Sequence, residues 1–130
     1  MYTNLSEQTF KVLTIRQPWA NSIMLLNKDV ENRTWSTHYR GKLLIHSSSC
    51  NPTKNDKQRL QQILESTGDQ IPSSMTTGAI LGYVELVDIV TNSDSHWAIP
   101  NQNHWLIKNP VLFSSPIPCK GRLGLWKPNY

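Results

Sequence analysis

The feature that most constrains the fold is an apolar run in the second half of the chain. Residues 78–90 read GAILGYVELVDIV, and β-branched residues are frequent among them. Such a run is typical of a strand buried in the centre of a sheet. Gly82 lets the strand bend or approach another backbone segment closely. Glu85 lies inside the run, and we expect it to be paired or to belong to a site, because burying a lone carboxylate is costly.

Four other segments are strand candidates. Residues 11–16 alternate apolar and polar side chains, and residues 42–47 place Leu43 and Ile45 on one face and Leu44 and His46 on the other. Residues 105–113 and 122–126 are the further candidates. Residues 30–35, VENRTW, are too polar for a strand buried on both faces, so we expect a strand end or an extended loop at the surface. Residues 92–103 are polar and rich in turn formers, which predicts a loop.

Two helices are predicted between these strands. Pro18 suits the first turn of a helix, and apolar residues then recur at helical spacing until the helix closes near Asn27. Asn51 is a candidate N-cap for a second helix, with Pro52 behind it, and Gly68 is expected to stop this helix. The apolar stripe of the second helix is Leu60, Ile63 and Leu64. Strands and helices without strict alternation indicate an α+β fold with a strongly curved sheet or a small barrel.

The length of 130 residues suits one core, so we expect a single domain over residues 1–130, with residues 1–9 as a flexible N-terminal extension. No apolar stretch approaches the roughly 20 residues of a membrane span, and the N-terminus lacks a basic stretch followed by an apolar one. These features predict a soluble cytoplasmic protein with no membrane partner. Cys50 and Cys119 have no Cys or His nearby at metal-ligand spacing. We therefore expect reduced thiols, no zinc or other metal, and no cofactor.

The charge balance and the tryptophan content favour a flat, anionic ligand. Thirteen basic against nine acidic residues give a net charge of +4 and a pI near 9.2, a mild excess that attracts polyanions. Five tryptophans in 130 residues are unusual, and their rings suit stacking on bases. Trp97, in the predicted loop, either closes over a ligand or anchors the loop. The expected ligand is nucleic acid or a nucleobase derivative.

A charged cluster follows the first predicted helix. Lys28, Glu31 and Arg33 fall within six positions in the segment KDVENRTW. If the chain is extended from Val30 onward, Glu31 and Arg33 project from one face, and Lys28 hangs from the turn before it. A carboxylate beside two cations can accept from an exocyclic amine while the cations hold a phosphate or a base carbonyl. The alternative is a solvated salt bridge that organises the turn.

Aromatic and polar residues around this cluster are candidates for the rim of a cleft. Trp19 could stack a base and Gln17 could read its edge, since both flank Pro18 at the mouth of the first helix; the alternative is that Trp19 packs in the core. Trp35 has the better claim to partial exposure. Tyr39 and Arg40 complete a basic and aromatic rim, in which Arg40 either contacts phosphate or caps a neighbouring carboxylate.

His46 and the basic residues of the second helix have competing interpretations. A lone histidine in a strand is more often a structural residue than a catalyst, but a polar lip of serines and Lys54 follows it. Lys54, Lys57 and Arg59 fall on the exposed side of the second predicted helix, where a solvated face explains them better than a phosphate track does.

Several motifs occur in a characteristic order along nearly the whole chain. They are QPWA at residues 17–20, K-x-x-E-x-R at 28–33, YRG at 39–41, GAILGYVELVD at 78–88 and P-x-x-G-x-x-G-L-W at 118–126. In this order they resemble an ASCH domain, the activating signal cointegrator homology domain of the PUA-like superfamily. Leu26, followed by Asn27, departs from the family, which usually has Gly two positions before the Lys. The resemblance implies an α+β fold, with a small β-barrel of about five or six strands flanked by two or three helices. It also implies a cleft beneath the first helix in which Lys28, Glu31 and Arg33 converge.

The resemblance implies a module that binds RNA or DNA, with a role in RNA metabolism or in regulating transcription or translation. The sequence leaves the oligomeric state open, and we expect a monomer. The expected ligand-binding residues are Gln17, Trp19, Lys28, Glu31, Arg33, Trp35, Tyr39, Arg40, His46 and Lys54. The alternative is a hydrolase similar to a ribonuclease or an acetylcytidine amidohydrolase, in which Lys28 is itself activated by desolvation or activates water, and Glu31 moves protons. A distant hydrolase branch carries Thr at the position of Glu31, which argues against the same reaction. A third interpretation is a protein-interaction adaptor.

Overall fold

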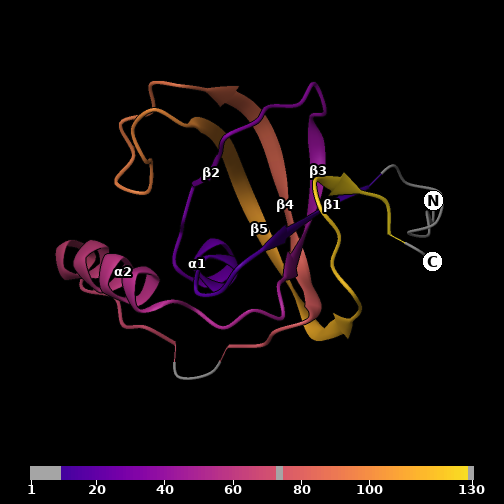
Figure 1. Cartoon of the computed structure of the whole chain (residues 1–130), viewed down its shortest axis with the longest axis horizontal. Coiled ribbons are helices and arrows are strands. Elements are labelled where there is room, and N and C mark those ends of the chain that lie inside the picture. Colours follow the sequence, from indigo (N-terminus) through magenta and orange to yellow (C-terminus); the bar gives the residue numbers. More distant parts are fainter. Residues whose placement is uncertain (1–9, 73–74, 129–130) are drawn as a thin grey trace.

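A computed structural model describes residues 10–72 and 75–128. The described residues form one six-stranded mixed sheet with the order β2-β5-β4-β3-β1-β6 and two helices (Figure 1). The strands are β1 (Lys11–Ile15), β2 (Val30–Arg33), β3 (Gly41–Ser47), β4 (Ala79–Val90), β5 (Asn103–Pro118) and β6 (Leu125–Trp126). This sheet curls into a half-barrel, which confirms the expected α+β fold. The N-terminal extension expected at residues 1–9 lies outside the described residues.

The core forms where the sheet curls around α1 (Trp19–Leu25). Figure 1 shows α1 within the curl of the sheet and α2 (Lys54–Thr67) farther out. Ile23 and Met24 of α1 are buried against apolar side chains of β1, β3, β4 and β5. These side chains are Leu13, Ile15, Leu43, Ile45, Leu81, Val84, Leu86, Trp105 and Ile107. The apolar run of residues 78–90 is confirmed as a central strand, since β4 pairs with β3 on one side and β5 on the other.

The helix boundaries differ in part from those predicted. The first helix ends at Leu25, and Asn27 adopts a left-handed conformation (φ 59°), which Asn tolerates in turns. Asn51 as N-cap of α2 is wrong. Thr53 caps the helix instead, because its hydroxyl accepts from the backbone N–H of Asp56 while the Asp56 carboxylate accepts from the backbone N–H of Thr53. Gly68 ends α2 as expected (φ 78°). Neither described helix has the length and apolar character needed to cross a bilayer.

Three sheet predictions need correction. Glu85 is exposed, neither buried nor at a cleft; it lies opposite Lys42 of β3 and Lys108 of β5, so the carboxylate stays in water between cationic neighbours. β5 extends to Pro118, well beyond the predicted end, because β4 offers pairing partners as far as Ala79, which lies opposite Pro118. β6 contains only Leu125 and Trp126, which pair with β1.

Gly82 marks a close approach between neighbouring elements of the sheet and α1. A Cβ atom at this position would lie 2.1 Å from the carbonyl oxygen of Val111 and 2.8 Å from Cε of Met24. Register shifts between β4 and β5 flank the same point. The absence of a side chain therefore allows β5 and α1 to close on β4 here.

We expect Gly82→Ala to lower the free energy of unfolding by about 1–3 kcal/mol, because the new methyl group overlaps backbone atoms that cannot move independently. Urea denaturation measures the change. Ser114→Ala, at an exposed position of β5, is the matched control. Equal stability of the two variants would contradict the close approach at Gly82.

Candidate functional site

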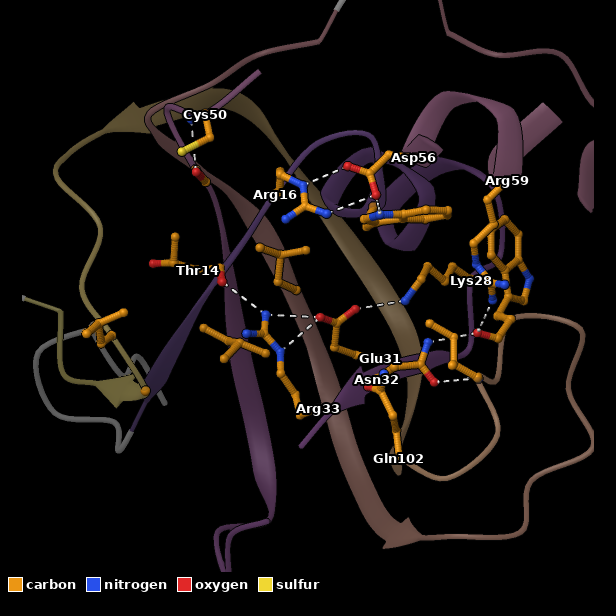
Figure 2. A pocket seen from close by; sticks show the side chains of 18 of the residues that line it. Thr14, Arg16, Lys28, Glu31, Asn32, Arg33, Cys50, Asp56, Arg59 and Gln102 are labelled. Atoms are coloured by element: carbon orange, nitrogen blue, oxygen red, sulfur yellow. Dashed lines mark hydrogen bonds and ion pairs between the residues drawn. The ribbon is translucent and has the colours of Figure 1, made fainter. Parts of the chain in front are cut away.

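A cavity of about 460 Å³ lies where the two ends of the curled sheet face each other. Its lining comes from β1, β2, both helices, the loop of residues 91–102 and the segment that precedes β6. The volume falls within the range of sites for small molecules and cofactors. We call it the main cavity, and Figure 2 shows its lining side chains.

The centre of the main cavity is a chain of three charged side chains. The ammonium group of Lys28 donates to Glu31 Oε1 over 2.8 Å and also to the carbonyl oxygen of Val30. Arg33 Nε donates to Glu31 Oε2 over 3.0 Å, and Arg33 Nη2 donates to the carbonyl oxygen of Thr14 over 3.0 Å (Figure 2). Because Thr14 belongs to β1, Arg33 links β2 to a strand from the far part of the sheet order.

Local geometry explains why these three residues converge. Asn27 turns the chain, so Lys28 enters from the turn, and β2 then alternates so that Glu31 and Arg33 share a face, as the sequence predicted. The side chains of Lys28 and Glu31 are only 3% and 9% exposed, whereas that of Arg33 is 24% exposed. Arg33 is thus the member of the cluster that reaches solvent.

Burial and neighbouring charges have opposite effects on the pKa values of Lys28 and Glu31. Burial lowers the pKa of Lys28, although the neighbouring Glu31 carboxylate counteracts this effect. Burial alone would raise the pKa of Glu31, but the charges of Lys28 and Arg33 outweigh it and hold that pKa below its usual range. Glu31 is therefore a fixed carboxylate, and both of its oxygens accept hydrogen bonds from protein cations.

Asp56 forms a second charged centre at the other side of the main cavity. Its two oxygens accept from Arg16 Nε over 2.7 Å and from Arg16 Nη2 over 2.9 Å, and Oδ1 also accepts from the indole N–H of Trp19 over 3.1 Å. Burial opposes ionisation of Asp56, but the hydrogen bonds from Arg16, Thr53 and Trp19 lower its pKa well below the usual range. One carboxylate thus connects the end of β1, α1 and α2.

The loop of residues 91–102 is tied to this site. The side-chain N–H of Asn32 donates to the carbonyl oxygen of Trp97 over 2.9 Å, and its oxygen accepts from the backbone N–H of Ile99 over 2.8 Å. Arg59 donates to the same Trp97 carbonyl over 3.4 Å, and its guanidinium lies 5.8 Å from the ring centre of Trp19. Trp97 is buried, so of the two interpretations the structure supports its role as an anchor of the loop.

Among the predicted site residues, the structure brings four together. Trp19, Lys28, Glu31 and Arg33 line the main cavity. Gln17 does not: it is fully buried, and its amide donates to the side chain of Asn21 and to the carbonyl oxygen of Thr76.

Five other predicted residues lie outside the main cavity. Trp35 packs edge-to-face on Trp105, with ring centres 4.8 Å apart, and Tyr39 packs on the same core. Arg40 pairs with the carboxylate of Asp88 over 3.4 Å, so of its two predicted roles the structure supports the capping of a neighbouring carboxylate. Lys54 is an exposed residue in the first turn of α2.

The fifth predicted residue outside the main cavity is His46. It is buried in β3, and its Nε2 donates to the carbonyl oxygen of Cys119 over 2.8 Å, a structural contact.

Sequence reasoning missed Arg16, Asn32, Asp56 and Arg59 as lining residues. The solvated position predicted for Arg59 is wrong, because Arg59 is half-buried. A signal was available, since Asp56, Arg59 and the stripe of α2 recur at three- and four-residue spacing and therefore share one helix face. Within residues 10–72 and 75–128 we find no cluster of His, Cys, Asp and Glu suited to hold a metal ion.

We expect Asp56→Asn to lower the free energy of unfolding by about 2 kcal/mol near neutral pH, because it weakens the helix cap and the bonds to Arg16 and Trp19. The folded-state pKa of Asp56 is below its unfolded value, so the stabilisation is present above about pH 4 and is lost as the pH falls. Denaturation at several pH values measures this. A pH-independent difference between variant and wild type would contradict the assignment; Asp94→Asn, in the exposed loop, is the control.

For the buried pair we expect Lys28→Met to lower the free energy of unfolding by about 3–5 kcal/mol, since Glu31 then keeps only Arg33 as a partner. Lys28→Met/Glu31→Met should lose clearly less than the sum of the two single changes, because no unpaired charge stays buried. A double-mutant cycle in urea gives the coupling energy. Additive losses would show that the pair is not coupled.

Comparison with known proteins agrees with this architecture. The family model described as "ASCH domain" matches residues 13–116. The chain is 28% identical over 125 residues to activating signal cointegrator 1 of Homo sapiens, and equally so to the protein of that name from Mus musculus. Each match covers 88% of this chain but 22% of the relative, so the chain spans about a fifth of the length of these relatives. The chain belongs to the ASCH domain family.

Proposed function

We propose that this ASCH domain binds nucleic acid and holds one nucleotide of RNA or DNA in the main cavity. The observation that carries the proposal is the charge of the lining. Two carboxylates line the cavity, Glu31 and Asp56, and both are already paired with protein cations. The basic lining residues are Arg16, Lys28, Arg33, Arg59 and Arg122. Their excess over the carboxylates leaves a positive field at the mouth, which suits a phosphate.

The burial of the side chains assigns them different parts in binding. Lys28 is enclosed and hydrogen-bonded, so we assign it the role of holding Glu31 and not that of touching the ligand. Arg16 is 46% exposed, and Arg33 retains donors beyond the bonds it makes, since a guanidinium has five N–H groups. These arginines are the candidates for phosphate contacts. Trp19, half-buried beneath Arg59, offers a flat face near a base.

Family membership supports the same ligand class. PUA-like domains are often linked to RNA binding, and the relatives bear the name of a cointegrator of activating signals. A role in RNA metabolism or in the regulation of transcription or translation fits both facts. Fold alone does not specify the ligand, so the charge of the cavity is the stronger argument.

A hydrolase is the alternative, with Lys28 and Glu31 as catalytic residues. Proximity favours it, because the two groups are 2.8 Å apart at the cavity and burial lowers the pKa of Lys28. However, a general acid or base needs a pKa near the working pH, and the pKa of Glu31 is lowered by two cations. The arrangement therefore favours binding over proton transfer.

We expect Arg59→Ala to weaken binding of labelled single-stranded RNA or DNA by about fivefold or more, because the guanidinium lies at the cavity over Trp19. Fluorescence anisotropy at two salt concentrations measures the affinity. Lys57→Ala is the matched control, since Lys57 lies two positions earlier on α2, carries the same charge and is exposed away from the cavity lining.

The outcomes separate the candidate functions. Equal losses in the two variants would mean general attraction to the surface and would reject the main cavity. No binding to either nucleic acid would overturn the proposed function and favour a protein partner. Cleavage products in the same samples would favour the hydrolase.

A further inference from the structure

A second cavity adjoins the main cavity. Its volume is about 580 Å³. Four residues line both cavities: Thr14, Ser48, Arg122 and Leu123. These residues form a wall shared by the two cavities, which are therefore neighbours.

The lining of the second cavity carries cations but no carboxylates, unlike the lining of the main cavity. Lys120 and Arg122 line the second cavity, and no Asp or Glu does. Among the residues that the structure describes, neither cation forms an ion pair. Ser48 and Ser49 add hydroxyl donors to the same lining. Uncompensated cations beside hydroxyl groups suit one more phosphate.

The segment that carries these cations is held close to the sheet. The carbonyl oxygen of Cys119 accepts from His46 Nε2, and its N–H donates to the carbonyl oxygen of Gly78 over 3.0 Å. A Cβ atom on Gly121 would lie 2.9 Å from atoms of both His46 and Thr14, so only glycine allows this approach. Lys120 and Arg122 flank that point and are therefore positioned over the cavities by the backbone.

The concave shape of the two cavities favours a single strand over a duplex. Bases in a duplex are paired and stacked, and they reach such pockets only if they leave the stack. A single strand has free bases, and Leu123 on the shared wall is 99% exposed, which offers them an apolar surface.

We propose, resting on the proposed function, that the ligand is a single strand of at least two nucleotides. One nucleotide occupies the main cavity, and the phosphate of the next lies in the second cavity against Lys120 and Arg122.

The experiment compares a mononucleotide, a tetranucleotide, an eight-nucleotide single strand and a duplex of the same sequence, each as RNA and as DNA, by competition in fluorescence anisotropy. We expect the tetranucleotide to bind about tenfold tighter than the mononucleotide, and the single strand to bind tighter than the duplex. Lys120→Ala should weaken binding of the tetranucleotide and the eight-nucleotide strand about fivefold but leave mononucleotide binding unchanged, because Lys120 lines the second cavity and not the main one.

Two further variants separate the effect of the second cavity from that of general surface charge. Lys108→Ala removes the same charge from an exposed position of β5 that lines neither cavity, and it should change nothing. Gly121→Ala displaces the segment without changing charge, and it should reproduce the effect of Lys120→Ala.

Three results would overturn the two-nucleotide path: affinity independent of length, duplex bound as tightly as single strand, or equal effects of Lys120→Ala and Lys108→Ala. If mononucleotide binding and its sensitivity to Arg59→Ala persist in those cases, the proposed function stands and only the path fails. No binding at any length overturns both.

Discussion

The carboxylate of Glu31 lies between Lys28 and Arg33, and through Arg33 it is connected to the backbone of Thr14. In the sheet order, three strands separate β2 from β1, so this connection crosses the gap that backbone pairing leaves open. A buried carboxylate tolerates such a position only when cations neutralise it. The closure of the half-barrel, the floor of the main cavity and the direction of Arg33 all depend on this network.

Internal pairing of the acidic groups also determines the electrostatics of the cavity. Glu31 and Asp56 are each held by protein cations, so neither repels an anionic ligand as a free carboxylate would. Asp56 contributes structure at the same time, because it caps α2 and receives hydrogen bonds from Arg16 and Trp19. A small domain thereby uses the same residues to orient its helices and to expose arginines at the mouth of the cavity.

Much of this arrangement could be predicted from local patterns. The run of residues 78–90 is a central strand, and its first apolar residues, Ala79, Ile80 and Leu81, are buried on both of its faces. Gly68 ends α2 for a reason visible in the sequence, since glycine adopts the left-handed conformation without strain. Other local predictions failed where alternatives competed. Thr53 rather than Asn51 caps α2 because only Thr53 has Asp56 three positions later to complete the capping box.

By itself, the sequence determined where most strands and helices form, though not all of their ends, and the grouping of Lys28, Glu31 and Arg33, because these depend on side-chain periodicity and on neighbours a few positions apart. Only the tertiary structure decided which other residues join them. Arg59 and Arg122 are far apart in the chain, and they reach one cavity only because α2 packs beside α1 and the segment before β6 returns to β1. Tertiary packing likewise places the side chain of Gln17 in the protein interior and not in the cavity. Such long-range contacts are set by how apolar faces fit together, which no local pattern in one sequence contains.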